Sequence, residues 1–385
     1  MDIIEKLAAV VGSDIQFSPA KCLHTTNRAS TCDRCVAFCS TGAISAGPPI
    51  AQNPERCVKC GLCLHTCPTG AYEGDDGRAN LLAHVAAVTA RGDVAVLEFA
   101  CKYHPSPEAG PPADAVLRVP GCLGLLSPSA LVAAAALGAR TLRLRLERCQ
   151  NCPMGRAQCG IEESVRAARE LFAAVGAPGE VELVTAESAA DGWESRPVRD
   201  AAGPVFSRKG LFRAKGGEAP QTVGHALAAE GAARHLDIPR ERLRLLLALE
   251  RLPYRREHLP AELGFALMEV SGDCTACGVC ARVCPTDALR MLKDNEGAFY
   301  LTFRAGACVG CDACLTYCEP GVLTSAGAPT LERLLDPDPV VLASGSLRAC
   351  QKCGIEYAGP EGSTLCSLCE FRRKNPFGSR RPERN

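Results

Sequence analysis

The chain has 385 residues, and its 43 Lys and Arg residues balance 43 Asp and Glu residues, so its formal net charge is zero. A chain without net charge has no overall field that would draw it to nucleic acid or to a membrane surface. The 25 cysteines leave two classes of protein: a secreted disulfide scaffold or a metal protein of a reducing compartment.

The amino-terminal segment favours the second class. Residues 1–6 (MDIIEK) carry no basic region followed by an apolar stretch, so they do not resemble a secretory signal. No apolar run reaches the ~18 residues that a transmembrane helix needs. The odd number of cysteines also argues against complete disulfide pairing. We therefore expect a cytoplasmic protein with bound metal and no membrane span.

Residues 1–77 carry eight cysteines in two runs and predict a first metal-binding module. The second run, residues 57–68, has the spacing Cys-x2-Cys-x2-Cys-x3-Cys-Pro. Three thiolates at this spacing let a tight loop wrap one face of a four-iron cubane, and in two-cluster proteins the fourth cysteine of each run serves the other cluster. Pro68 suits this position because it fixes the backbone where the chain leaves the cluster. Structural zinc is the alternative, but zinc usually takes two pairs of ligands.

Residues 78–190 predict a small parallel α/β domain, because strand-like runs alternate with helix-like stretches. Ser127 is a suitable N-cap, and an apolar stripe from residue 161 to 175 at helical spacing ends at Gly176. The expected strands are residues 94–99, 115–119, 141–146 and 181–184.

Cysteines follow the first three of these strands, and the ends of parallel strands lie along one edge of a sheet. Four thiols would therefore meet there, a set that suits a two-iron cluster or a zinc ion. Cys159 is left over, as a spare thiol or as a replacement for one of the four. The expected ligands are Cys101, Cys122, Cys149 and Cys152.

Residues 191–260 are predicted to be a linker that contains helices. The first part is rich in Pro, Gly and Arg. Residues 240–252 are rich in Leu and Arg and predict a helix that Pro253 stops.

Residues 261–335 repeat the pattern of the first module, with the same cysteine spacing over residues 274–285 and a companion run from 308 to 318. Between the two runs, apolar stretches flank Asp294-Asn295-Glu296-Gly297, a sequence typical of a β-hairpin. We therefore expect a second two-cluster module here.

Residues 345–371 hold two Cys-x2-Cys pairs separated by 12 residues, which is a strong signature of a tetrahedral four-sulfur site. Zinc is the first choice because few aromatic residues lie nearby, and iron is the alternative. Residues 372–385 form a basic tail without periodicity and are expected to be disordered. The expected ligands are Cys350, Cys353, Cys366 and Cys369.

Basic clusters recur, but the neutral chain has no interleaved aromatic residues, so we expect no nucleic-acid partner. A solvated face or a docking surface for an acidic partner subunit explains these clusters more simply. They comprise Arg140, Arg143, Arg145 and Arg148, then Arg240, Arg242 and Arg244, and the tail.

Residues 272–323 resemble a bacterial dicluster ferredoxin, and residues 20–73 resemble a second copy. The resemblance implies four [4Fe–4S] clusters, two in each module. Its implied ligand sets are Cys22, Cys32, Cys35 and Cys67; Cys39, Cys57, Cys60 and Cys63; Cys274, Cys277, Cys280 and Cys318; and Cys284, Cys308, Cys311 and Cys314.

The first copy departs from this pattern. Nine residues, rather than two, separate Cys22 from Cys32, so a loop has to bulge out between these ligands. If Cys22 does not bind, that site has three cysteines or is empty. Ser40 and, in the second copy, Glu319 stand where Pro usually follows the fourth cysteine. His65, inside the second run, is expected to face solvent.

The middle domain resembles the small iron–sulfur (delta) subunit of methyl-viologen-reducing hydrogenases. The matching features are the strand before Cys101, the Gly121-Cys122 pair before a helix, and the Cys149-x2-Cys152 pair. In that family the subunit links hydrogenase to heterodisulfide reductase. The resemblance implies an electron-carrying subunit whose partners are hydrogenase, heterodisulfide-reductase-like or other oxidoreductase subunits.

The sequence as a whole predicts an α+β multidomain protein: two ferredoxin-like dicluster modules, a parallel α/β domain between them, and a zinc-ribbon-like knuckle. It shows no Gly-x-Gly-x-x-Gly loop after a strand and no Walker loop, so nothing nominates a nucleotide or substrate site. We expect four [4Fe–4S] clusters, one [2Fe–2S] cluster and one zinc ion in an electron-carrying subunit rather than a catalytic chain. The alternatives are a redox-sensing regulatory or assembly protein and an oxidoreductase whose substrate binds at the middle cluster.

Overall fold

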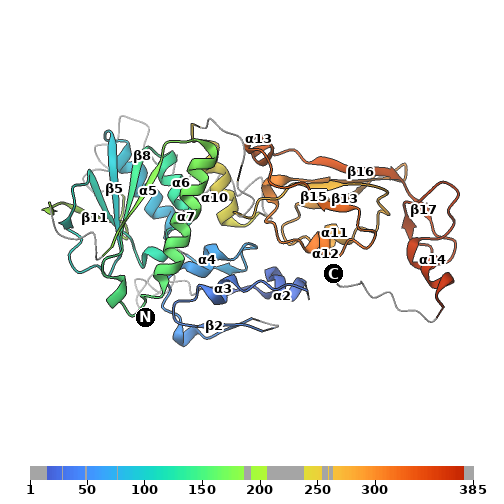
Figure 1. Cartoon of the computed structure of the whole chain (residues 1–385), viewed down its shortest axis with the longest axis horizontal. Helices are drawn as coiled ribbons and strands as arrows, with labels where there is room; N and C mark the ends of the chain where they lie inside the picture. Colours follow the sequence, from blue (N-terminus) through green and yellow to red (C-terminus); the bar gives the residue numbers. More distant parts are fainter. Residues whose placement is uncertain are drawn as a thin grey trace, which may run out of the picture. The chain divides into compact units, whose positions relative to one another are not determined.

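The structure is a computed structural model that describes residues 15–27, 29–47, 50–75, 77–185, 192–205, 238–253, 259 and 263–376 (Figure 1). The chain divides into two compact units, which are described separately. The first comprises residues 1–25 and 31–260, and the second comprises residues 261–385 with the short segment 26–30. The expected first module and the expected α/β domain therefore form one unit.

The main sheet of the first unit consists of five strands: β5 (Val94–Ala100), β7 (Ala115–Arg118), β8 (Ala139–Arg145), β9 (Glu180–Val184) and β11 (Val198–Asp200). They are all parallel, in the order β11-β7-β5-β8-β9. The four expected strands are confirmed within two residues at each end. Strand β11 lies in the segment predicted to be a linker, because Arg199 and Asp200 give this short edge strand no apolar pattern.

Four helices accompany this sheet: α5 (Arg78–Thr89), α6 (Pro128–Ala136), α7 (Ala157–Val175) and α10 (Arg240–Leu249). As expected, the Ser127 hydroxyl accepts a hydrogen bond from the Ala130 N–H at 3.2 Å and caps α6. Helix α7 ends at Gly176 in the left-handed conformation (φ 63°) that favours glycine. Helix α10 packs against α6 (Figure 1), so the predicted linker contributes a helix to this unit.

A buried layer of charge lies on one face of the sheet. Glu98 points to the opposite face from Leu97 and Phe99, because successive strand residues alternate. Its carboxylate is fully buried and accepts hydrogen bonds at 2.9 Å from both Arg145 and Arg196. The carbonyls of Pro107 and Ala109 also accept hydrogen bonds from these two arginines. Ala109 belongs to strand β6 (Ala109–Gly110), which pairs with β10 (Glu194–Ser195), directly before Arg196.

The first basic cluster is divided between the surface and the interior, so its assignment to a solvated or docking face was wrong for Arg143 and Arg145, whereas Arg140 and Arg148 are exposed. Arg140 pairs with Asp93 at 2.5 Å, and Arg143 pairs with Glu182 at 2.8 Å. Arg145 belongs to the buried layer. Three of its four arginines are therefore held by carboxylates of the same chain.

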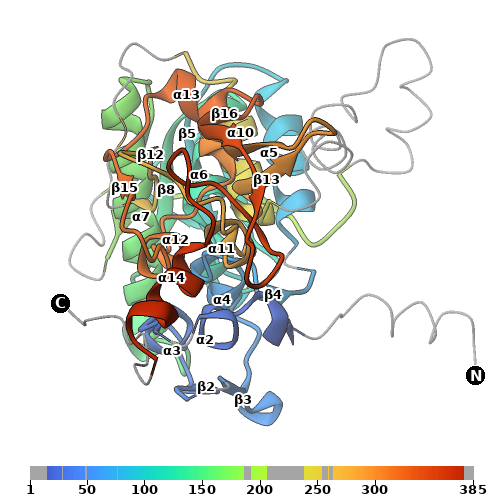
Figure 2. The same ribbon diagram turned by 90° about the vertical axis from the view of Figure 1, so that its right-hand side faces the viewer.

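The amino-terminal module of this unit is built from short elements (Figure 2). Its small core includes Ile44, Ile50, Leu64 and Tyr72, and the rings of Phe17 and Tyr72 lie 5.1 Å apart. Strand β1 pairs with β4, and β2 pairs with β3, in both cases antiparallel. The elements are β1 (Gln16–Phe17), η1 (Pro19–Lys21), α2 (Leu23–Thr26), α3 (Arg34–Ala37), β2 (Ile44–Ser45), β3 (Ala51–Gln52), η2 (Pro54–Arg56), α4 (Leu62–Thr66) and β4 (Tyr72–Glu73).

The second unit contains the other cysteine-rich module. The expected β-hairpin is confirmed, and a strand that the sequence did not predict adds to it in the order β13-β14-β16. Buried Phe299, Leu301 and Phe303 alternate along the central strand. The elements are β12 (Met268–Val270), α11 (Val279–Arg282), β13 (Leu289–Lys293), β14 (Ala298–Phe303), η7 (Ala305–Ala307), α12 (Ala313–Thr316), β15 (Leu323–Ser325), α13 (Leu331–Leu335) and β16 (Val340–Ser346).

The last described elements are β17 (Arg348–Ala349), β18 (Glu356–Tyr357) and α14 (Ser367–Lys374), of which the two strands pair antiparallel. Helix α14 runs into the segment predicted to be a disordered tail, which corrects that boundary. The rest of the predicted tail from residue 377 lies outside the described residues, as does the part of the predicted linker at 206–237. Within the described ranges, no helix combines the length and apolar character that a bilayer crossing requires.

Candidate metal centres

Three small cavities, each of about 20 Å³, are each lined by one of the expected cysteine quartets. Each quartet includes the fourth cysteine from the other run, as the ferredoxin resemblance implies. The remaining walls are mainly apolar, which fits a cluster held away from water. The quartets are Cys22, Cys32, Cys35 and Cys67; Cys274, Cys277, Cys280 and Cys318; and Cys284, Cys308, Cys311 and Cys314.

The first of these cavities includes Cys22 despite the long gap that follows it in the sequence. Cys22 is buried at the start of α2. Burial raises the pKa of Cys35 to about 11, and the nearby thiols of Cys67, Cys32 and Cys22 add to the shift. Four thiols thus share one apolar space. Burial also raises the pKa of Cys32, so Cys32 and Cys35 favour the thiol form without metal, and iron would displace their protons on binding.

A further quartet of the first module comprises Cys39, Cys57, Cys60 and Cys63. Burial raises the pKa of Cys63, and the thiols of Cys60, Cys57 and Cys39 raise it further, so these groups lie within electrostatic reach of one another. The Ala43 N–H donates to the Cys39 sulfur at 3.1 Å. Such N–H donors stabilise the negative charge of a cluster and tune its potential.

Ser40, which departs from the family pattern, has a specific contact in this quartet. Its side chain is buried, and its hydroxyl donates to the Cys60 sulfur at 3.6 Å. A proline at this position could not make that hydrogen bond. Sequence reasoning registered only the missing proline.

The middle domain brings its four expected cysteines together beside the carboxyl ends of β5, β7 and β8. Burial raises the pKa of Cys149 to about 12, with further contributions from Cys122, Cys101 and Cys152. The Cys122 sulfur accepts from the Gly124 N–H and the Cys152 sulfur from the Met154 N–H, both at 3.4 Å. These thiols therefore have the donor set and the backbone N–H groups that suit a cluster. Cys159, in contrast, has an exposed side chain on α7.

A buried acid–histidine pair lies next to this quartet and was missed from the sequence. His104 Nε2 donates to Glu147 at 2.9 Å, while the His104 Nδ1 accepts from the Ser106 N–H at 3.2 Å. Burial alone would raise the pKa of Glu147, but hydrogen bonds from His104 and Arg145 outweigh it and lower the pKa to about 2. Their positions in the sequence could have indicated this pair, because His104 lies three residues after Cys101 and Glu147 lies two residues before Cys149.

Glycines allow the first module and the middle quartet to approach closely. A Cβ on Gly124 would lie 3.1 Å from the Cys60 carbonyl oxygen, and a Cβ on Gly61 would lie 3.2 Å from the Leu125 Cβ. His65 Nε2 donates to the Gly124 carbonyl at 2.9 Å, so the expectation that His65 faces solvent was wrong. The loop of Cys60 therefore packs directly on the loop that follows Cys122.

The same proximity is visible in the electrostatics of the thiols. Burial raises the pKa of Cys122 to about 12, and the thiol of Cys60, in the first module, adds to the shift together with Cys101 and Cys152. Cys35 similarly contributes to the raised pKa of Cys63. Three quartets of the first unit thus follow one another in space.

The two quartets of the second unit are also neighbours. Burial raises the pKa of Cys314, and the contributing thiols include Cys308, Cys311 and Cys284 of its own quartet and Cys280 of the other. Glu319, the second departure from the pattern, is exposed.

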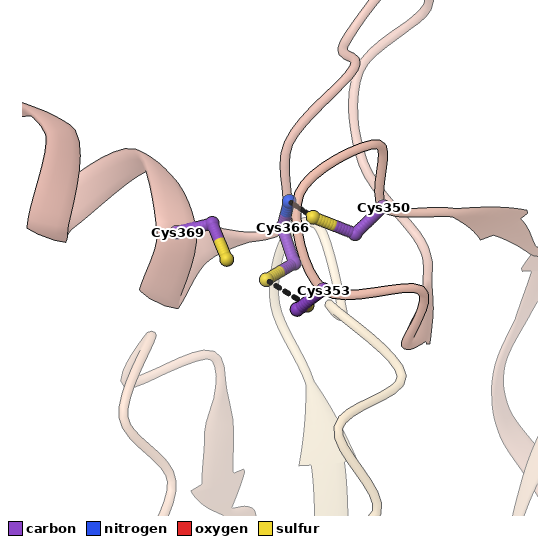
Figure 3. Close-up of side chains that lie close together, drawn as sticks. All are labelled: Cys350, Cys353, Cys366 and Cys369. Atoms are coloured by element: carbon purple, nitrogen blue, oxygen red, sulfur yellow. Dashed lines mark hydrogen bonds between the residues drawn. The ribbon is translucent and has the colours of Figure 1, made fainter.

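The four carboxy-terminal cysteines form the most compact sulfur group (Figure 3). All four sulfurs lie within 4.8 Å of one another, and those of Cys353 and Cys366 are 3.8 Å apart. A tetrahedron with metal–sulfur bonds of about 2.3 Å has sulfur–sulfur edges of about 3.8 Å, so the space suits one ion. Backbone N–H groups, above all that of Cys366 at 3.3 Å, lower the pKa of Cys350 to about 6. One thiolate is thus favoured before metal binds.

Comparison with known proteins supports the two dicluster modules. Residues 28–71 and residues 273–322 match the family model described as a 4Fe-4S dicluster domain. The chain therefore carries two 4Fe–4S dicluster domains, which support a role in iron–sulfur electron transfer. Cys22 lies outside the first matched segment.

An uncharacterized protein of Methanothermobacter thermautotrophicus is similar to part of the chain, with 31% identity over 77 residues. The match covers 20% of this chain and only 17% of that protein. No solved structure matches the chain.

Proposed function

We propose that this chain carries single electrons along a series of iron–sulfur clusters, as an electron-transferring subunit of an anaerobic redox complex of the hydrogenase or heterodisulfide-reductase kind. The dicluster domains support the electron-transfer role itself. The complex is proposed from the resemblance of the middle domain to the hydrogenase delta subunit.

One observation carries the proposal: the thiol quartets of the first unit are consecutive. Helix α3, which carries Cys35, packs against α4, which carries Cys63, and α4 in turn contacts residues 123–125, directly after Cys122. Isolated structural metal sites have no reason to be arranged in a row. A row of redox centres is what stepwise electron transfer needs.

When bound, the clusters would supply one-electron redox chemistry. The chain's own residues hold the clusters by thiolate ligation, exclude water with apolar walls, and place N–H and O–H donors on sulfur. Ala43 and Ser40 are such donors in the first module. The number of such donors and the burial of the site would set the reduction potential of each cluster relative to that of its neighbour.

The middle quartet is proposed to hold a two-iron cluster. Four thiols are the ligand set of a two-iron cluster, and among the described cysteines these sulfurs do not form a group as tight as the 4.8 Å set at the carboxy terminus, which argues against a single zinc ion. The carboxy-terminal quartet is proposed to hold zinc, which is redox-inert and would serve structure or docking. The partners would be redox subunits that deliver and accept electrons.

Metal and sulfide analysis of the anaerobically purified full chain tests this proposal. Four cubanes and one two-iron cluster predict about 18 iron and about one zinc per chain. A content of about 16 iron per chain would indicate that the middle cluster is absent. About two zinc together with about 16 iron would indicate that the middle site is a structural zinc site. A folded protein that stayed colourless and EPR-silent after reduction would overturn the electron-transfer function.

A further inference from the structure

We propose that Arg78 and Glu241 are a positioning pair that holds two cysteine loops together and tunes the electron step between them. The loops are residues 57–63 of the first module and residues 122–125 of the middle domain. The inference rests on the proposed function, because it assigns these two side chains a role in transfer between the clusters that the two loops would ligate.

Arg78 contacts both loops with one guanidinium group. It is the first residue of α5, and its side chain is only 1% exposed. Its Nε donates to the Leu125 carbonyl, and its Nη2 reaches the Gly61 carbonyl at 3.4 Å. Gly61 follows Cys60 directly, and Leu125 lies three residues after Cys122. A planar guanidinium is suited to this task because its N–H donors have a fixed geometry.

Glu241 holds this guanidinium from the other side. Arg78 Nη1 donates to Glu241 Oε1 at 2.8 Å, and Arg244 donates to the same oxygen. The Ser129 hydroxyl donates to Oε2 at 2.5 Å. Burial would raise the pKa of Glu241, but the cations of Arg244 and Arg78 outweigh it, so the carboxylate stays ionised. Helix α10 thus contributes a fixed counter-charge to the junction.

The position of this charge matters for electron transfer. Reduction adds one negative charge to a cluster, and a buried cation nearby favours that state because the local dielectric constant is low. Removing Arg78 should therefore disfavour reduction of the cluster of Cys39, Cys57, Cys60 and Cys63. Removing the charge of Glu241 should favour it. If the two residues had a purely structural role, removing Arg78 and removing the charge of Glu241 would not shift the reduction potential in opposite directions.

The residues of the two loops would hold the two clusters between which the electron passes: Cys57, Cys60 and Cys63 on one side and Cys122 on the other. If both were loaded, one electron would pass from one cluster to the other, with no bond formed or broken and no proton required. Dithionite supplies the electron in the test. The loop contacts fix the separation that the electron has to cross.

The experiment uses the full holoprotein, purified without air, in the variants Arg78→Met, Arg78→Lys and Glu241→Gln. Arg140→Met is the matched control, since it also removes a paired arginine but at the amino-terminal end of β8, away from the cysteines. EPR-monitored titration gives the midpoint potential of each cluster, hydrogen exchange reports on residues 122–126, and iron analysis reports loading.

We expect Arg78→Met to reduce the equilibrium constant for cluster reduction about tenfold, a decrease of about 59 mV for a one-electron couple. Glu241→Gln should shift the potential upward, and Arg140→Met should leave it unchanged. Arg78→Lys should keep the wild-type potential but increase hydrogen exchange in residues 122–126 and weaken the magnetic coupling between the two clusters, because an ammonium cannot bridge both carbonyls.

Shifts of the same sign in Arg78→Met and Glu241→Gln, or none in either with full iron content, would overturn the inference. If Arg78→Met does not fold, the sign of the Glu241→Gln shift decides. A wild-type protein without iron would refute the proposed function as well, and its lack of colour distinguishes that result from failure of the positioning pair alone.

Discussion

Substitution of Gly155 by Ala should empty the middle site without altering any thiol. A Cβ at this position would lie 2.5 Å from the Cys149 carbonyl oxygen and 3.1 Å from the Cys152 carbonyl oxygen. Ordinary contact begins at 3.4 Å, so the backbone that carries two of the four ligands has to move by 0.9 Å. Neither contact is with a flexible side chain that could turn away. Overpacking of this kind costs about 1–3 kcal/mol.

The expected result is a loss of about two iron from a total of about 18, with the four cubane sites still loaded. Metal analysis per chain gives the iron, and EPR after reduction shows which signal disappears. Gly92→Ala is the matched control, because a Cβ there meets nothing within 4 Å. A Gly155→Ala protein with full iron and an unchanged spectrum would refute the proposed ligation of the middle site. Loss of one zinc at constant iron would identify a structural zinc site instead.

Three further predictions test the other sites. Cys369→Ser should remove one metal ion per chain and leave the iron content unchanged, as metal analysis would show. Ser40→Ala should lower the potential of the cluster that Cys60 ligates by roughly 40 mV, since a hydrogen bond contributes on the order of 1 kcal/mol; a redox titration with no shift would contradict this. Glu98→Gln should destabilise the α/β domain by about 3–5 kcal/mol, because Arg196, which pairs with Glu98 and is 3% exposed, would keep a buried, uncompensated charge; urea unfolding with a loss below about 1 kcal/mol would count against it.

The ferredoxin resemblance implied which cysteines share a quartet, and the structure brings these quartets together because the spacing in each run reflects the geometry of a cluster. A cubane needs ligands at its corners, and a tight loop can supply three of them at only a few spacings. The cavities consequently contain the expected cysteines, including Cys22, whose spacing is irregular. The strands of the middle domain were equally visible because Val, Leu and Phe recur along them. Assignment of these thiols as iron ligands remains a prediction.

Contacts between segments that are distant in the sequence could not be predicted from local sequence patterns. Arg78 and Glu241 lie 163 positions apart, and neither belongs to a local motif. His65 looked like a solvent-facing residue because its acceptor, the Gly124 carbonyl, belongs to another domain. Arg143 and Arg145 looked like part of a surface patch, yet their carboxylate partners Glu182 and Glu98 lie on neighbouring strands. Charge patterns along a sequence do not show which charges the fold will neutralise.

Placement of small residues explains how the redox sites can be close without sharing ligands. Gly61 and Gly124 lie where the loops of two quartets meet, and a Cβ on Gly160 would lie 2.6 Å from Leu62 Cδ2, one residue before Cys63. A Cβ at Gly61 or Gly124 would require the facing loop to shift by a few tenths of an ångström, and one at Gly160 would require the Leu62 side chain to move. The φ of +84° at Gly61 favours glycine independently of this contact. Separate metal sites would tolerate such a shift, whereas electron transfer depends on the separation between centres. On the proposed function, glycine at Gly124 therefore serves to keep the two sites close.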